Sequence, residues 1–183
     1  TGPAPTLVGL ETSTAAHVAE VCYALATLML GQGASLSGQQ LLQLAWALAP
    51  QPHYAFYLGV LAEEQEDYTG AALWYGRVPT GHPLTVAAQV RVAVVTALQD
   101  DVTAARQQLQ ALIKAGAGTP LVLLTLAELA FEHDDFTGAV AAYTQLIKTA
   151  PEASPALRAD WRFGRGAAYE RLGQFAAARA DLE

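Results

Sequence analysis

The apolar spacing of residues 120–153 constrains the fold of this chain more than any other feature. Apolar side chains recur there at the three- and four-residue steps of an α-helix. Thr119 and Pro120 predict a capped helix start, and Pro151 predicts a helix end. The segment therefore predicts an antiparallel helical hairpin with two apolar stripes, formed by Leu123, Leu126, Ala127 and Ala130 and by Phe136, Ala139, Tyr143 and Leu146.

The hairpin resembles a tetratricopeptide repeat (TPR), a unit of about 34 residues. In this family a large apolar residue followed by Gly or Ala marks the first helix. An aromatic residue, an alanine, a further aromatic or apolar residue and a proline mark the second. These places are held here by Leu126, Ala127, Phe136, Ala139, Tyr143 and Pro151. The mid-helix alanines are expected to let the paired helices approach closely.

The same spacing predicts a single array over residues 1–183. We expect an extended lead-in at 1–13, a degenerate repeat at 14–51, repeats at 52–85, 86–119 and 120–153, and a truncated repeat with a lengthened first helix at 154–183. One hairpin cannot bury both of its faces, so stacking predicts an all-α, right-handed α-solenoid of about four and a half to five TPR hairpins. A small residue falls at the same place in each repeat: Gly38, Ala71, Ala105, Ala139 and Ala178.

Composition narrows the classes of function. The chain has 183 residues, is 52% hydrophobic and carries a net charge of −7, which argues against disorder and against nucleic acid as a partner. The longest apolar run, 21–30, is shorter than the roughly 20 residues of a membrane span, so no span is expected. Cys22 is the sole cysteine, which excludes an internal disulfide. Because the chain begins with Thr and ends within a predicted helix, we expect a fragment or a processed piece.

The resemblance implies a binding groove on the concave face, lined by the first helix of each repeat. The apolar and acidic mixture on that face favours a peptide or partner protein that is apolar with some basic residues. Phe56, Val60, Val90 and Val94 hold places that the family's carboxylate-binding groove gives to Lys and Asn, so that groove is not expected. The implied binding residues are Tyr23, Thr27, His53, Phe56, Val60, Glu63, Glu64, Val90, Val94, Leu98, Leu124, Glu128, Phe131, Phe163, Ala167, Glu170 and Arg171.

A packing role stays open for part of this set. Val90, Val94 and Leu124 can equally be core residues, or be covered by the lead-in. Phe56, Phe131 and Phe163 are favoured as contacts because aromatic side chains anchor interfaces. The three tryptophans fall at places that contact the adjacent repeat and are expected to be structural: Trp46, Trp74 and Trp161.

Catalysis has little support in the sequence. The best local cluster for a metal or an acid/base pair is Glu132, His133, Asp134 and Asp135, but it falls in a predicted turn, where solvation and helix capping explain it better. Cys22 lies on an apolar helix face and is expected to be an inert thiol. We therefore predict no enzyme activity, no cofactor and no metal.

Three functions follow. The favoured one is a non-catalytic scaffold that binds a peptide or partner protein in the concave groove. The alternatives are a module that assembles with itself through the exposed edge of its terminal repeat, and an enzyme or metal-binding protein centred on Glu132, His133 and Asp135. Residues 159–183 also resemble bacterial TPR proteins of uncharacterised role, which implies a periplasmic or envelope location, with a cytoplasmic location as the alternative.

Overall fold

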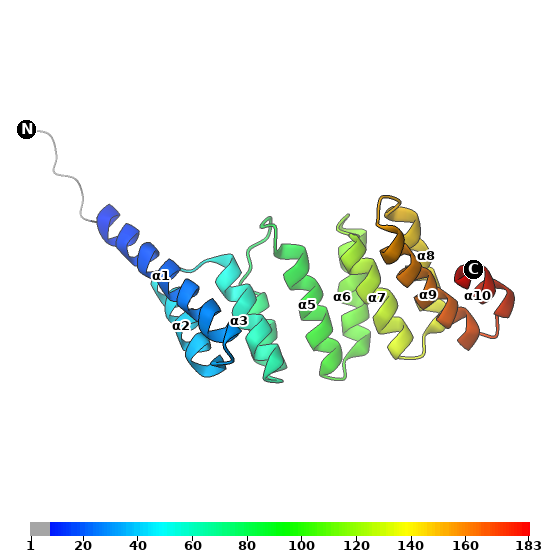
Figure 1. Cartoon of the computed structure of the whole chain (residues 1–183), viewed down its shortest axis with the longest axis horizontal. Coiled ribbons are helices and arrows are strands. Elements are labelled where there is room, and N and C mark those ends of the chain that lie inside the picture. Colours follow the sequence, from blue (N-terminus) through cyan, green and yellow to red (C-terminus); the bar gives the residue numbers. More distant parts are fainter. Residues whose placement is uncertain (1–7) are drawn as a thin grey trace, which may run out of the picture. The chain divides into compact units, whose positions relative to one another are not determined.

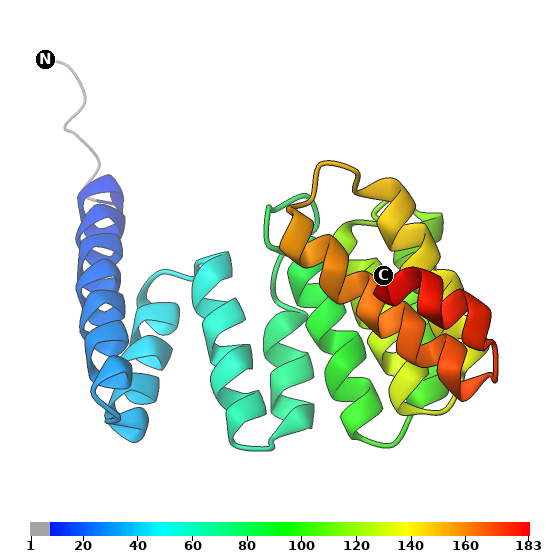
Figure 2. The same cartoon turned by 45° about the vertical axis from the view of Figure 1, so that its right-hand side comes forward.

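The computed structural model describes residues 8–183, with side chains from residue 14 onward. Over this range the chain is all-α, as predicted, and consists of helical hairpins (Figures 1 and 2). It contains ten helices and no strand within residues 8–183: α1 (Val8–Gly31), α2 (Ser35–Leu48), α3 (Pro52–Glu64), α4 (Tyr68–Tyr75), α5 (Thr85–Leu98), α6 (Val102–Lys114), α7 (Pro120–Glu132), α8 (Phe136–Thr149), α9 (Pro155–Arg171) and α10 (Phe175–Leu182).

The chain divides into two compact units, residues 1–88 and 89–183, where the repeat spacing predicted one array. In the N-terminal unit α1 packs on α2, α2 on α3, and α3 on α4. In the C-terminal unit α6 packs on α7, α7 on α8, α8 on α9, and α9 on α10. Within each unit, helices that follow one another in sequence are therefore neighbours in space, which is the contact pattern of a repeat protein.

The hairpin turns repeat one backbone conformation. Glu66, Asp100 and Asp134 all adopt a left-handed conformation, with φ of 60°, 65° and 60°, at the interval of one repeat. An aspartate follows each of them and caps the next helix, because its carboxylate accepts a hydrogen bond from a backbone N–H at 2.9 Å. The pairs are Asp67 with Gly70, Asp101 with Ala104, and Asp135 with Gly138.

Small residues allow the paired helices to cross closely. A Cβ atom added to Gly38 would lie 3.1 Å from the carbonyl oxygen of Ala26, and one added to Gly166 would lie 3.5 Å from that of Ala178. Gly59 serves a different contact, since a Cβ there would lie 2.6 Å from the ring of Tyr75. The buried ring of Tyr75 therefore packs in the space that a side chain at Gly59 would occupy.

Each unit has its own core. The N-terminal core joins α1, α2 and α3 around Leu42, Tyr54 and Leu58, and the C-terminal core joins α7, α8 and α9 around Leu123 and Leu146. The structural role expected for the tryptophans is confirmed. Trp161 is buried in the C-terminal core, while the rings of Trp46 and Trp74 meet edge to face at 5.7 Å under the guanidinium of Arg77.

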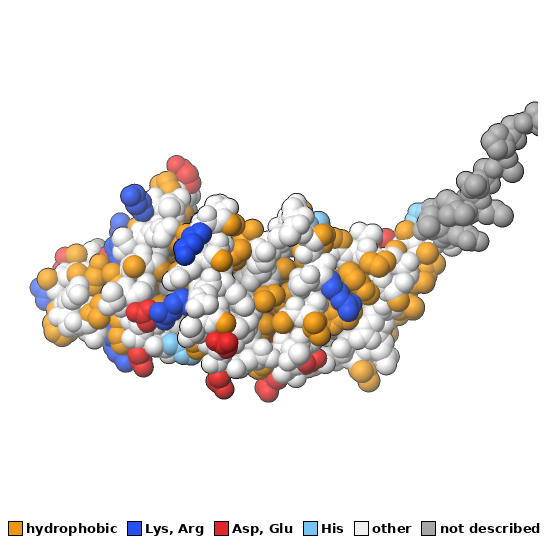
Figure 3. Space-filling model, turned by 180° about the vertical axis from the view of Figure 1, so that it is seen from behind, with side chains coloured by type: hydrophobic (Ala, Val, Ile, Leu, Met, Phe, Trp, Pro, Cys, Tyr) orange, Lys and Arg blue, Asp and Glu red, His pale blue; other side chains and the backbone are white. Residues whose placement is uncertain are grey.

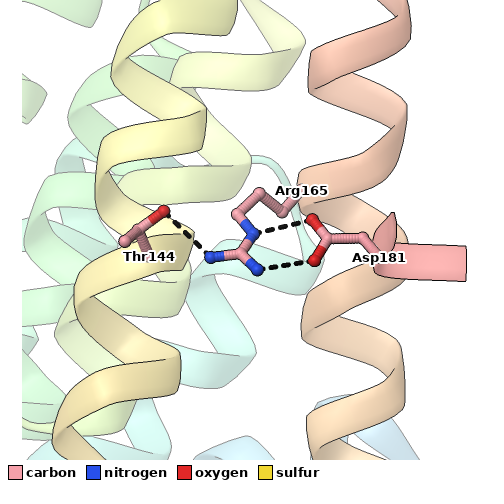
Figure 4. Close-up of polar contacts among 3 residues, drawn as sticks. All are labelled: Thr144, Arg165 and Asp181. Atoms are coloured by element: carbon pink, nitrogen blue, oxygen red, sulfur yellow. Dashed lines mark hydrogen bonds and ion pairs between the residues drawn. The ribbon is translucent and has the colours of Figure 1, made fainter. Parts of the chain in front are cut away.

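Arg165 occupies a place that is normally apolar in the family, and its contacts explain why it is tolerated. It donates two hydrogen bonds to Asp181, from Nε at 2.7 Å and from Nη2 at 2.5 Å, and a third to Oγ1 of Thr144 at 3.1 Å (Figure 4). The Asp181 hydrogen bonds raise the pKa of the Arg165 guanidinium above its ordinary value, so Arg165 stays charged. The side chain thus ties α9 to both α10 and α8.

Proline and serine positions set two helix lengths. The second helix of repeat 52–85 ends at Tyr75, four residues before Pro79, which has no N–H to continue it. Ser154 caps α9 by accepting a hydrogen bond from the N–H of Leu157, and Pro155 takes the first helical position. As a result α9 has 17 residues, against 13 in α7, which is about one additional turn.

The extended lead-in predicted for residues 1–13 is wrong over residues 8–13, where α1 has already begun. Pro5 is the last proline before α1. The single glycine that follows it within residues 8–13, Gly9, costs a helix only about 1 kcal/mol, so no residue after Pro5 prevents the helix from forming. Residues 1–7 of the predicted lead-in lie outside the described residues.

The longer α1 contains one segment that bears on the expectation of no membrane span. Its segment Thr14–Gly31 is long and apolar enough to cross a membrane by length and composition, with a mean hydropathy of 1.3. The sequence estimate counted only uninterrupted apolar residues and so missed it. Only 17% of this segment is buried, and its buried residues Ala19, Cys22 and Ala26 belong to the N-terminal core.

Gly59→Ala is expected to destabilise the protein by about 1–3 kcal/mol, because the ring of Tyr75 has no room to retreat from an added methyl group. Urea unfolding followed by circular dichroism measures the change. Gly31→Ala is the matched control, since a Cβ there meets nothing within 4 Å. Equal stability of the two variants would contradict the close contact.

Candidate functional site

The first helices of the N-terminal unit bring seven of the predicted binding residues onto α1 and α3. Glu64 and Thr27 are exposed, and the other five are half-buried. Two of these residues also serve the fold. Phe56 packs against the ring of Tyr75 at 5.4 Å, and Glu63 accepts a hydrogen bond from the Tyr75 hydroxyl at 2.9 Å. The seven are Tyr23, Thr27, His53, Phe56, Val60, Glu63 and Glu64.

Aromatic rings join α1 to α3 at this site. The ring of Tyr23 lies 5.0 Å from those of His53 and Tyr54 and 5.9 Å from that of Tyr57. The rings of His53 and Tyr54 are themselves 4.3 Å apart. Such tilted and edge-to-face pairs add to the stabilisation from buried area and fix ring orientations. The cluster therefore gives the site rigid walls.

A cavity of about 270 Å³ opens beside this cluster, and we call it the tyrosine pocket. Of its residues, the sequence identified Tyr23 and Thr27 and missed the others. Tyr57 is one place away from the family's groove positions, and Leu42 belongs to a second helix, so no groove pattern includes them. The pocket is lined by Tyr23, Ala26, Thr27 and Leu30 of α1, Leu42 of α2 and Tyr57 of α3.

Burial sets the protonation of the groups next to the pocket. It raises the pKa of the fully buried Tyr54 to about 12, assisted by the hydrogen bond that its hydroxyl donates to Glu20 Oε1 at 2.9 Å. Burial also lowers the pKa of His53, and His82 adds to this shift while Glu20 opposes it. Tyr54 and His53 are therefore both uncharged at neutral pH, and neither of them offsets the carboxylate of Glu20.

The C-terminal unit places its predicted residues in different surroundings. The prediction for Val90 is wrong, because its side chain is 2% exposed and belongs to the packing of α5. Val94 and Leu124 are half-buried, and Ala167 is too. Leu98 and Phe163 are exposed, by 50% and 66%.

The remaining residues of this unit lie on α7 and α9. Phe131 is half-buried, with its ring 5.4 Å from that of Phe136. Burial, followed by the neighbouring Glu132, raises the pKa of the Glu128 carboxyl. Glu170 is exposed, and so is Arg171, whose guanidinium lies 4.6 Å from the centre of the Phe136 ring. Acidic, basic and aromatic groups therefore alternate on these two helices.

The acidic turn 132–135 has structural uses. Asp135 caps α8, and its Oδ2 accepts a hydrogen bond from Nη1 of Arg106 at 2.6 Å. Asp134 takes the left-handed turn position and lies 3.5 Å from Nη2 of Arg171. Among the residues that the structure describes, no three His, Cys, Asp or Glu side chains are grouped to hold a metal ion. The turn is thus accounted for by capping and ion pairing.

Residues 124–183 match the tetratricopeptide repeat family model. Similar solved structures include MamA 41-end from Desulfovibrio magneticus RS-1, with 15% identity, a TM-score of 0.68 and coverage of 90% of each chain. PilW, a widely conserved type IV pilus biogenesis factor, has 13% identity, a TM-score of 0.72 and coverage of 97% of this chain and 91% of its own. No curated protein sequence matches the chain.

A third similar structure is the APC/C hetero-tetramer Cut9-Hcn1, with 15% identity and a TM-score of 0.69. The match covers 94% of this chain but only 35% of the chain in that structure. Stacked hairpins with capped turns thus define a tetratricopeptide repeat fold for the chain as a whole. By sequence, the similarity to the tetratricopeptide repeat family is confined to residues 124–183.

The Tyr54 hydroxyl should titrate near pH 12. Because this pKa lies above the ordinary 10.0, the stabilisation from neutral Tyr54 is complete below pH 10 and is lost as the pH rises from 10 toward 12. The tyrosinate absorbance of the protein minus that of Tyr54→Phe measures the titration. Glu20→Gln should lower the pKa only in part, because burial contributes more than the carboxylate. Ionisation of Tyr54 near pH 10 in the native protein would contradict the buried hydrogen bond.

Proposed function

We propose that this chain is a non-catalytic scaffold that binds a peptide or partner protein on the exposed face of its first helices. The observation that carries the proposal is the exposure of large apolar side chains on these helices. Tyr57 is 44% exposed on α3, Leu98 50% on α5 and Phe163 66% on α9. Exposed aromatic side chains such as those of Tyr57 and Phe163 are typical anchors of protein interfaces.

The fold supports the same function. Tetratricopeptide repeats commonly serve as interaction scaffolds, and one similarly folded chain belongs to the APC/C hetero-tetramer Cut9-Hcn1. The carboxylates among the proposed binding residues, Glu64, Glu128 and Glu170, favour a partner with basic residues beside its apolar ones. The chemistry of the acidic turn supports no competing enzymatic role, since its carboxylates cap and pair within the hairpin.

Phe163 and Phe175 provide a matched pair of positions for a test. They are the same residue type, are exposed by 66% and 71%, and belong to the same hairpin, but Phe163 is on the first helix and Phe175 on the second. A photoreactive phenylalanine analogue at 163 should crosslink a partner in native cells, and the same analogue at 175 should not. With the purified partner, Phe163→Ala should raise the Kd about tenfold or more, and Phe175→Ala should leave it within about twofold.

Equal effects of Phe163→Ala and Phe175→Ala on the purified complex would contradict the assignment of the first-helix face. Phe56 and Phe131 are less suitable probes than Phe163. Their rings pack against Tyr75 and Phe136, so truncation would also weaken the hairpins and confuse binding with stability.

We propose self-assembly through the terminal helices as the second candidate. Two exposed apolar edges favour it. On α10 the edge consists of Phe175 and Leu182. On α1 four exposed apolar residues follow the spacing of a helix-pairing seam: Val18, Val21, Leu25 and Leu28.

Under this second proposal, sedimentation velocity over a concentration series should show reversible association of the protein. Leu25→Glu should weaken it if the α1 edge is used, and Phe175→Glu if the α10 edge is used, because burying an unpaired carboxylate is costly. Leu73→Glu is the control, since Leu73 is exposed on α4, which contributes to neither edge. A single monomeric species at every concentration would contradict self-assembly and leave the scaffold proposal standing.

A further inference from the structure

The tyrosine pocket is a preformed space within the N-terminal unit. Its volume of about 270 Å³ is below the roughly 300–1,000 Å³ that small-molecule sites occupy, so it suits one side chain better than a whole ligand. Its walls are almost wholly apolar. Leu42 and Ala26 are buried at its inner side, whereas Tyr57 and Thr27 are exposed at its mouth. The pocket therefore opens to solvent at the face where the sequence places binding residues.

The fold holds this space open. Gly38 of α2 has no side chain, and a Cβ there would lie 2.6 Å from Cγ of Leu30, so the Leu30 side chain lies against α2. Tyr23 is fixed from the other side by its ring contacts with His53 and Tyr54. Tyr54 is in turn fixed by its hydrogen bond to Glu20. An occupant would consequently lose little free energy to reorganising the walls.

The surroundings of the pocket are acidic. The single Lys or Arg among residues 1–88 is Arg77, whose guanidinium lies 4.1 Å from the centre of the Trp74 ring and covers the Trp46 ring as well. All other Lys and Arg residues of the chain belong to the C-terminal unit (Figure 3). The acidic residues of the N-terminal unit are Glu11, Glu20, Glu63, Glu64, Glu66 and Asp67.

Such a field attracts cations and repels anions. It disfavours an anionic membrane surface or an acidic peptide as the occupant, and it accelerates the approach of a basic one. His53 does not offset the negative charge, because its imidazole is neutral at neutral pH. Charge complementarity therefore favours basic residues on either side of the occupying residue, and the apolar walls favour an apolar side chain inside the pocket.

We propose that the tyrosine pocket takes one leucine or phenylalanine side chain from a basic peptide segment of a partner protein. The inference rests on the proposed scaffold function and gives it a specific anchor and charge. The apolar side chain enters beside the paired rings of Tyr23 and Tyr57, while lysine or arginine residues on either side of it meet the acidic field of the N-terminal unit.

The probe is the synthetic peptide acetyl-Lys-Lys-Ala-Leu-Ala-Lys-Lys-amide, titrated into the whole isotope-labelled chain and followed by NMR. Two matched peptides replace its leucine with alanine or all its lysines with glutamate. The leucine peptide should shift the amide signals of Thr27 and Tyr57. Loss of the leucine should weaken binding about ten- to hundredfold, as expected for one buried apolar side chain. The glutamate peptide should not bind, and added salt should weaken the lysine peptide.

Protein variants test the pocket itself. Thr27→Trp should fill its mouth and abolish the signal shifts. Thr149→Trp is the matched control, because both threonines are exposed and donate their hydroxyl to a backbone carbonyl one turn earlier, at 2.8 and 2.9 Å. Tyr57→Ala, which removes a wall without overfilling, should weaken binding about tenfold or more. Circular dichroism checks that each variant is folded.

Several results would overturn the inference. They are equal binding of the leucine and alanine peptides, binding of the glutamate peptide, and unchanged binding to Thr27→Trp. Signal shifts confined to the C-terminal unit would also overturn it while leaving the scaffold function intact. The scaffold function is tested separately, by the affinity of the Phe163→Ala variant for the purified partner. The two proposals can therefore fail independently.

Discussion

The structure depends on how closely the two helices of a hairpin can approach. Backbones meet where one helix presents glycine or alanine, as Gly166 does over Ala178 and Gly38 does over Ala26. Where the small residue instead faces an aromatic ring, the ring fills the space, as Tyr75 does at Gly59 and Tyr143 at Gly164. These two contacts set the spacing of the helices, and the spacing decides which side chains stay in the core and which reach the surface.

Much of the fold was predictable because several local signals agreed with one another. Small residues at a fixed interval predicted the crossings, and prolines and serines predicted helix ends such as that of α4 and the start of α9. The left-handed turn residues were less obvious, because Glu66 and Asp100 are not the glycines that usually take this conformation. Their places are set by the helices on either side and by the capping aspartate that follows.

The candidate site was only partly predictable, since burial depends on neighbouring helices that the sequence pattern does not position. Val90 holds a groove place yet is buried, whereas Phe163 holds the same place in the last repeat and is exposed. The tyrosine pocket was missed for a related reason. Its inner wall, Leu42, comes from α2, and Leu30 lines it because a glycine on α2 makes room for it. A pattern drawn from first helices alone contains neither residue.

Arg165 and Arg77 show how the scarce basic residues are used. Arg165 is committed to Asp181 and Thr144 between helices, and Arg77 is stacked on Trp74. Arginine suits both places because its planar guanidinium can donate several hydrogen bonds and stack on a ring. In residues 1–88 Arg77 stands against six acidic residues, so the N-terminal unit keeps an excess of acidic side chains. The basic partner that we propose would be favoured by this excess of negative charge.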